Sequence, residues 1–260
     1  MNDIVAMCSY IKITIILIVL TYATVLDIKY RETPLKIWLS SIPIITLLTI
    51  FEYIEGIEYN LIITLYSCII SIAIPWIIYL SGLLGGADAL AYTLVTLGAP
   101  FRPLPMMTNV VPFPFLVLVY SNILPAIMAI ILLVYNLILN RHFIPKGVSL
   151  KTKMLLLVNG VPIKVSRYLR QKYTYPLQIF EEDHELVVKY RSAFNIDEDP
   201  EEHRAKIRKL LERGLISSDS YIWVAYGLPY ILFILIGYIT SLIIADYPIL
   251  AIITKFLRES

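Results

Sequence analysis

The chain has 260 residues, of which 58% are hydrophobic and only 16% are charged, and its mean hydropathy is +0.74. Soluble globular domains are roughly 45–50% apolar and about 25% charged. This composition therefore excludes a soluble globular domain and a disordered chain. The net charge of +2 without a concentrated basic face gives no support for nucleic-acid binding.

The charged residues are unevenly distributed along the chain. The segment Asn140–Ser220 holds 15 of the 22 Lys and Arg residues and 11 of the 20 Asp and Glu residues. The remaining residues hold only 7 and 9 of them. This pattern predicts a membrane protein with one polar insert.

Helices that cross the hydrocarbon core need about 20 mostly apolar residues. Five stretches meet this criterion: Ser9–Leu26, Leu35–Phe51, Leu61–Leu80, Phe115–Leu139 and Tyr221–Ala245. A shorter apolar piece, Asp88–Ala99, lies between the third and fourth of them. Its length alone suits either a short span or a half-membrane segment.

Charge placement gives an orientation. The loop after the first span carries Lys29, Arg31 and Lys36, and the insert begins with four basic residues, whereas the loop around Glu52 has three Glu and no basic residue. The positive-inside rule then places the first loop and the insert in the cytoplasm. Both can lie there only if Asp88–Ala99 also crosses the membrane. Both termini, Glu52, Asp246 and Arg102 then lie outside, and Arg102 alone counts against this arrangement.

The predicted fold class is an α-helical polytopic membrane protein with six transmembrane helices. A small cytoplasmic α+β insert lies between helices five and six. The predicted domains are a membrane domain over residues 1–139, a cytoplasmic soluble domain over 140–220, and a sixth helix with a C-terminal tail over 221–260. The predicted location is the plasma membrane, with the site and the insert facing the cytoplasm.

Local patterns predict structure within the insert. The runs Met154–Val158 and Val161–Val165 flank Asn159-Gly160 and predict a β-hairpin. Leu186–Tyr190 reads as another strand. Glu201–Arg213, preceded by Pro200 and followed by Gly214, predicts a charged helix.

Two carboxylates stand out because acidic residues next to apolar spans are costly. Asp27 ends the first span and Asp88 starts the fourth, and the predicted topology puts both at the cytoplasmic face. A pair of carboxylates at one depth suits an aspartic hydrolase, in which one ionised and one protonated group share a proton. Because a helix N-terminus favours negative charge, we expect Asp88 to be the ionised member.

Each aspartate also has a simpler interpretation. Asp88 can be a helix N-cap, since Gly85-Gly86 and Ala87 precede it and an apolar run follows. Asp27 can simply pair with Lys29 or Arg31 at the membrane interface. Gly85 and Gly86, which lack side chains, would let an extended substrate approach closely.

Two motifs resemble those of a known family. Asp27-Ile-Lys-Tyr-Arg-Glu-Thr-Pro34 resembles the first-aspartate motif of the type IV prepilin peptidase and preflagellin peptidase family. Gly85-Gly86-Ala87-Asp88 resembles that family's second motif, Gly-x-Gly-Asp in its strict form and Gly-x-hydrophobic-Asp in its looser form. The six-helix plan with an insert before the last helix is similar to that of the archaeal preflagellin peptidases.

The resemblance implies a membrane-embedded aspartic endopeptidase of the GxGD type. Asp27 and Asp88 would be the catalytic pair, and Gly85, Gly86 and Ala87 would shape the site. The substrates would be preflagellin or prepilin-like precursors with a short basic leader and a hydrophobic helix, cut at the cytoplasmic membrane face. No metal or cofactor is implied. The cysteine tetrad of the larger bacterial enzymes is absent, so no N-methylation activity is expected.

Two further possibilities remain open at this point. An ion-coupled transporter would use the two aspartates as ion ligands, although no internal repeat is visible. A non-catalytic membrane scaffold would explain the insert but not the two motifs. The acidic stretches Glu181–Glu185 and Asp197–Glu202 either attract a basic leader or are solvated loops.

Overall fold

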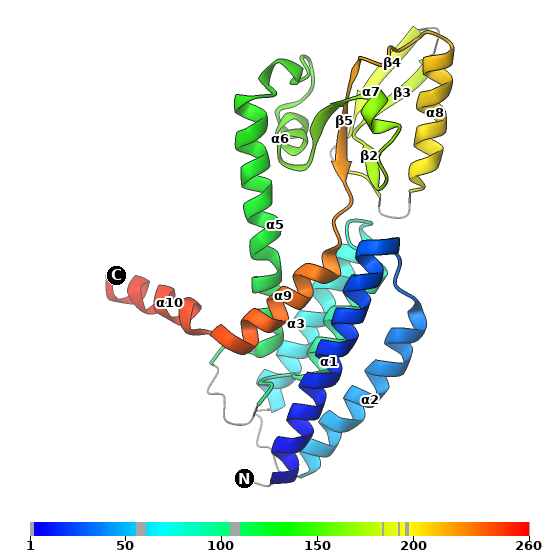
Figure 1. Ribbon diagram of the computed structural model, residues 1–260. Helices are drawn as coiled ribbons and strands as arrows, with labels where there is room; N and C mark the ends of the chain where they lie inside the picture. The colour runs from blue at the N-terminus through cyan, green and yellow to red at the C-terminus, as the bar shows by residue number, and fades with distance from the viewer. Residues whose placement is uncertain are drawn as a thin grey trace. The chain divides into compact units, whose positions relative to one another are not determined.

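The computed structural model describes residues 3–55, 61–104, 110–183, 185–191, 193–195 and 198–259. The chain forms two compact units. The helical unit comprises Met1–Pro125 and Pro229–Ser260, and the mixed unit comprises Ala126–Leu228. Both are labelled by element in Figure 1.

Long apolar helices build the helical unit. They are α1 (Asp3–Tyr30), α2 (Leu35–Ile54), α3 (Leu61–Leu80), α4 (Gly86–Gly98), the first half of α5 (Phe113–Ile138), α9 (Tyr230–Ile244) and α10 (Tyr247–Glu259). Within the described residues, α1, α2, α3 and α5 are each long and apolar enough to cross a membrane, and the bent pair α9–α10 would be a fifth span. The chain is thus a multi-pass membrane protein, as its composition predicts.

The short helix α4 lies at the centre of the helical unit. It packs against α1, α2, α3 and α9, and Figure 1 shows α1 and α2 side by side. Its residues Ala91, Leu94 and Val95 are fully buried in a core with Ile16 of α1 and Ile45 of α2. With 13 residues it rises about 20 Å, less than a bilayer core of about 30 Å.

A buried ion pair lies at the C-terminal end of α4. The Lys12 Nζ and Glu52 Oε2 atoms are 2.5 Å apart, and their side chains are 3% and 1% exposed. Lys12 also donates to the Gly98 carbonyl at 2.7 Å, and Ser9 donates to Glu52 at 2.7 Å. Glu52 therefore does not face solvent at the outer surface, because a cation from the middle of α1 needs it as a counter-charge inside the unit.

The predicted span Tyr221–Ala245 is wrong in its first part. Tyr221–Tyr226 forms strand β5, and α9 begins only at Tyr230. The apolar run is continuous in hydropathy, but Gly227 and Pro229 separate the strand from the helix. At the other end, Ala245 has a positive φ of 53°, and α10 continues at 70° to α9.

The mixed unit combines short strands and helices. Its elements are the second half of α5, the 3₁₀ turn η1 (Arg141–Phe143), α6 (Leu150–Asn159), β1 (Val161–Lys164), α7 (Val165–Tyr168), β2 (Thr174–Pro176), β3 (Gln178–Asp183), β4 (Glu185–Tyr190), α8 (Pro200–Glu212) and β5 (Tyr221–Tyr226). β5 is the centre of an antiparallel sheet of order β1-β5-β2, in which Val224 pairs with Val161 and Ala225 with Tyr175. β3 and β4 form a separate two-stranded sheet. The predicted strand Leu186–Tyr190 and the predicted charged helix are confirmed as β4 and α8.

The predicted hairpin at Asn159-Gly160 is wrong. The run before it belongs to helix α6, which starts at the N-cap Ser149 and ends at Gly160. Leu156 and Leu157 of α6 are buried against Trp223 of β5, and the Asn136 amide donates to the carbonyls of Leu157 and Gly160. β1 pairs instead with β5, which lies some 60 residues later in the chain. The strand partner of β1 is therefore distant in sequence, whereas a hairpin would require the adjacent run as the partner.

Replacing Lys12 with Met is expected to destabilise the protein by about 3–5 kcal/mol, because it leaves Glu52 buried without a counter-charge. Adding Glu52→Gln should recover most of that loss. The free energy of unfolding in mixed detergent micelles is the measurement, with exposed Lys36→Met as the matched control. Equal losses in the single and double variants would contradict a paired charge.

Candidate active site

Asp88 lies in the first turn of α4 and is 6% exposed. Its Oδ2 accepts a hydrogen bond from the Gly85 N–H at 3.0 Å, and Gly85 is the residue that caps the helix. Asp88 is therefore not the N-cap itself. It occupies the third helical position, where a carboxylate satisfies a free backbone donor and faces the positive end of the helix dipole.

Asp27 lies near the C-terminal end of α1 and is half-buried. Its carboxyl group lies near the backbone N–H of Ile231 and interacts with the charge of Arg31. Ile231 is in the first turn of α9, so Asp27 also faces a helix N-terminus. The Asp27 Oδ2 atom is buried without a hydrogen-bond partner among the described residues, which leaves one oxygen available for a water molecule or a substrate.

The fold brings the two aspartates together, because Asp27 lies close enough to Asp88 for their charges to interact. The two residues come from different helices and lie at the same end of the helical unit. At the opposite end, Lys12 of α1 contacts Glu52 of α2 and Gly98 of α4. α4 therefore runs antiparallel to α1 and leads from the level of the aspartates to the level of Lys12.

Hydroxyl groups lie beside the pair. Tyr92, one helical turn after Asp88, forms a short hydrogen bond with Ser121 of α5, and its hydroxyl is 3.5 Å from that of Tyr230. Tyr230 donates to Asn122 Oδ1 at 2.6 Å. Asp88 interacts electrostatically with both tyrosines, so α4, α5 and α9 are joined by polar contacts next to the carboxylates.

Two family patterns match the chain. That of the Type IV leader peptidase family matches residues 14–133, and that of the Archaeal Peptidase A24 C-terminus Type II matches residues 152–247. Both describe the same group of peptidases, and together they cover most of the sequence. The chain belongs to the type IV leader peptidase family. None of the curated proteins matches it.

Membership in a leader peptidase family makes this chain a multi-pass membrane peptidase. The first match contains both Asp27 and Asp88, and the second contains β5 and the first turn of α9. The second match thus covers residues of the mixed unit and also α9, the helix whose first turn lies near Asp27. Neither the carrier nor the scaffold interpretation accounts for these matches.

The residues before Asp88 lie at the accessible side of the peptidase's carboxylate pair. Gly85, Gly86 and Ala87 are all partly exposed, whereas Asp88 and Ala89 are buried. A Cβ atom at Gly86 would lie 3.3 Å from Cε2 of Tyr79, so this glycine lets α4 approach α3 closely. Whether Gly85 and Gly86 also admit a substrate backbone stays a prediction.

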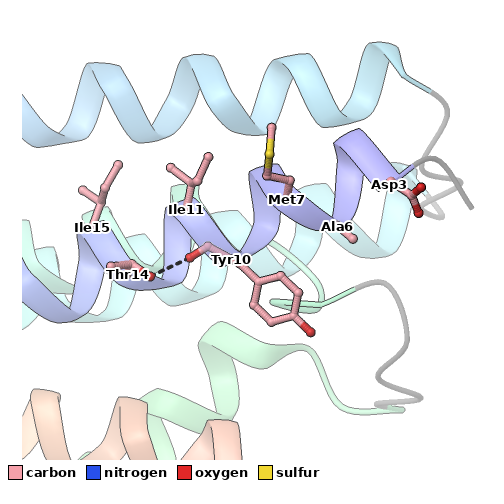
Figure 2. A pocket seen from close by; sticks show the side chains of 7 residues that line it. All are labelled: Asp3, Ala6, Met7, Tyr10, Ile11, Thr14 and Ile15. Carbon is pink, nitrogen blue, oxygen red and sulfur yellow. Dashed lines mark hydrogen bonds between the residues drawn. The ribbon is translucent and has the colours of Figure 1, made fainter.

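Neither Asp27 nor Asp88 lines either of two surface hollows. Figure 2 shows one of about 520 Å³ along α1, lined by Asp3, Ala6, Met7, Tyr10, Ile11, Thr14 and Ile15. Ile15 is twelve residues from Asp27 on the same helix, about 18 Å away. The other, about 510 Å³ in the mixed unit, is lined by Lys164, Arg167 and Arg170 among others. Its charge does not suit a basic leader.

Several acids of the two acidic stretches are already paired in the mixed unit. Glu181 pairs with Lys189, Glu198 with Arg191, and Glu201 with Arg204. Burial raises the pKa of Glu198, but hydrogen bonds from Arg191, the Asn195 N–H and His203 outweigh burial and hold that pKa below its usual value. The side chains of Glu182–Glu185, and all of Asp197, lie outside the described residues. These pairs favour a structural role for the acids that are described.

Sequence reasoning missed two features around the site. One is the buried Lys12. It is a lone cation inside an apolar span, and such a cation requires a counter-charge, so the sequence did carry a signal for it. The other is the contact of Ile231 and Tyr230 with the aspartate region, which carried no local signal because an apolar residue contributes only its backbone N–H.

Replacing Asp88 with Ala is expected to lower the stability by about 1 kcal/mol relative to Asp88→Asn. The asparagine keeps an acceptor for the Gly85 N–H, whereas alanine leaves that donor unsatisfied. Thermal unfolding of the two purified variants in one detergent measures the difference. Identical melting curves would show that the Gly85–Asp88 hydrogen bond does not stabilise α4.

Proposed function

We propose that this peptidase is an aspartic endopeptidase that uses Asp27 and Asp88 to remove a short basic leader from preflagellin or prepilin-like precursors. The observation that carries the proposal is that two carboxyl groups from different helices lie at one end of the helical unit, close enough for their charges to interact. The free Oδ2 atom of Asp27 and the buried Asp88 give the pair two different environments. Such a difference suits an acid and a base acting together.

The proposed hydrolysis needs one ionised and one protonated carboxyl group. The ionised group takes a proton from a water molecule as the water oxygen attacks the scissile carbonyl carbon. The protonated group donates its proton to the carbonyl oxygen. The tetrahedral intermediate then collapses: the C–N bond breaks, the leaving amine takes the proton that the first carboxylate received, and one hydroxyl group of the intermediate returns a proton to the second carboxylate.

We also propose that the chain crosses the membrane six times, with the aspartates and the mixed unit at the cytoplasmic face. The antiparallel course of α4 relative to α1 supports α4 as the fourth crossing, although α4 is shorter than a bilayer core. The residues after Gly98 would then complete the crossing. The predicted division at residues 139 and 220 stays a proposal, whereas the compact units meet inside α5, after Pro125, and beyond β5, after Leu228.

The proposed substrate follows from where the pair lies. A precursor whose hydrophobic helix enters the bilayer presents the junction between leader and helix at the cytoplasmic face, level with the aspartates. The basic leader would then stay in the cytoplasm. The lipid bilayer is thus a partner of the reaction, and no nucleic acid takes part in it.

Asp27→Asn and Asp88→Asn are each expected to reduce cleavage of such a precursor by about three orders of magnitude or more, with no further large loss in the double variant. The assay mixes membranes containing the enzyme with a tagged precursor and follows its mobility shift. Asp246→Asn is the matched control, since Asp246 is also buried but accepts hydrogen bonds from Val110 and Val111 instead. Cleavage that survives either catalytic replacement would overturn the assignment.

The topology has its own test. In a background without Cys8 and Cys68, Lys146→Cys and Arg258→Cys place single thiols at two exposed positions. A membrane-impermeant maleimide should label Lys146→Cys only in inverted vesicles and Arg258→Cys only in right-side-out vesicles. Labelling of both variants in the same vesicles would contradict an odd number of crossings between them.

A further inference from the structure

The last helix of the helical unit turns sharply away from the helix before it. α9 ends at Ile244, and α10 continues at 70° to it, as Figure 1 shows at the C-terminal end. Ala245, between the two helices, has a φ of 53°. A residue other than glycine keeps such a conformation only where its surroundings hold it. Because of the bend, α10 adds little to the depth that α9 crosses in the membrane.

Contacts with α5 and the residues before it hold this bend in place. The Tyr120 hydroxyl of α5 donates to the Ala245 carbonyl at 2.7 Å. Asp246 is only 4% exposed, and its Oδ2 atom accepts hydrogen bonds from the backbone N–H groups of Val110 and Val111 at 2.6 and 3.0 Å. These two residues shortly precede α5. The bend is therefore part of the fold, and α10 begins at the end of the helical unit from which α5 starts.

The sequence of α10 is amphipathic. Ile249, Ile253 and Phe256 follow one another at spacings of four and three residues, so they share one face of the helix. Lys255 and Arg258, three residues apart, lie on the opposite face. Two cations in one short helix are costly in the hydrocarbon core. α10 is therefore suited to a boundary between apolar and polar surroundings rather than to the interior of the bilayer.

The apolar face of α10 has no protein cover. In the part of the chain that the structure describes, α10 makes no extensive contact with another helix or strand, and Ile253 and Phe256 are 45% and 71% exposed. At the start of the helix, Ile249 and Leu250 are partly buried, whereas Tyr247 is exposed. The apolar face is thus turned toward the membrane-embedded helical unit where α10 begins.

We propose that α10 is an interfacial helix that binds the lipid surface of the membrane in which the chain is embedded. Its apolar face lies among the ends of the acyl chains nearest the headgroups, and Lys255 and Arg258 point toward the lipid phosphates. Two observations select lipid as the occupant. The apolar face is continuous with the apolar helix α9, and the two cations lie on the face opposite it, where headgroup phosphates would be.

This role goes beyond the proposed peptidase activity and does not depend on it. α9 packs against α1 and α4, the helices that carry Asp27 and Asp88. An interfacial α10 would hold the C-terminal end of α9 at the membrane surface and so set the depth of α9 beside those helices. The inference applies to whichever membrane face α9 ends at, and the proposed topology makes that the outer face.

Spin labels on single cysteines test this placement in the full-length protein. In the background without native cysteines, Ile253→Cys and Phe256→Cys label the apolar face, and Lys255→Cys and Arg258→Cys label the polar face. The proteins are reconstituted into vesicles of phosphatidylcholine and phosphatidylglycerol, and collisions with oxygen and with a water-soluble nickel chelate report depth. Labels on the apolar face should lie about 5–10 Å below the phosphates, and labels on the polar face at the phosphates or outside them.

Two matched controls set the scale. Ile69→Cys, in the middle of α3, replaces an exposed apolar side chain of a long span and should report a deeper position than any label on α10. Lys206→Cys, on the exposed side of α8 in the mixed unit, should report water. The replaced side chains on α10 are exposed, so the variants should fold. If Phe256→Cys does not, Ile253→Cys and Arg258→Cys still give one position on each face.

Three results would overturn the inference. Nickel access at all four positions equal to that of Lys206→Cys would show that α10 extends into water. Depths equal to that of Ile69→Cys would show that α10 lies in the hydrocarbon core. Labels on the apolar face that are shielded from both reagents and show spin–spin broadening between copies would show a protein interface instead. Cleavage is not measured, so failure of the proposed function would leave the outcome unchanged.

Discussion

The side-chain contacts at the two ends of α4 are the constraint on which the helical unit depends. α4 is short and packs against four other helices, and side chains bind backbone groups at both of its ends. Asp88 accepts from the Gly85 N–H at one end, and the Lys12 ammonium donates to the Gly98 carbonyl at the other. An acceptor at the N-terminus and a donor at the C-terminus are the groups that the unpaired ends of a helix need.

The contacts that stabilise α4 also position the candidate active site. Lys12 must be buried to reach Gly98, and a buried cation requires the carboxylate of Glu52 as its partner. The pair fixes α1 and α2 against the C-terminal end of α4, and the same α1 carries Asp27 to the N-terminal end. The two carboxyl groups thus lie on α1 and α4, two helices that contact each other, rather than on loops.

The chain passes from the mixed unit back to the helical unit through a short connection. Only Gly227, Leu228 and Pro229 separate the central strand of the mixed unit from the helix that contacts Asp27. The second family match likewise extends from the mixed unit into α9.

The sequence by itself determined the membrane class, the long helices, the polar insert and the two motifs around Asp27 and Asp88, because hydropathy, charge and short motifs are local properties. It did not determine the helix before Gly160, the strand at Tyr221–Tyr226, the burial of Glu52 or the proximity of Ile231 to Asp27. Each of these depends on a partner far along the chain: β5 pairs with β1 and β2, Lys12 meets Glu52, and the first turn of α9 lies near Asp27 of α1. Such pairings arise only when the chain folds, since a short apolar run fits a strand and a helix equally well until its neighbours decide.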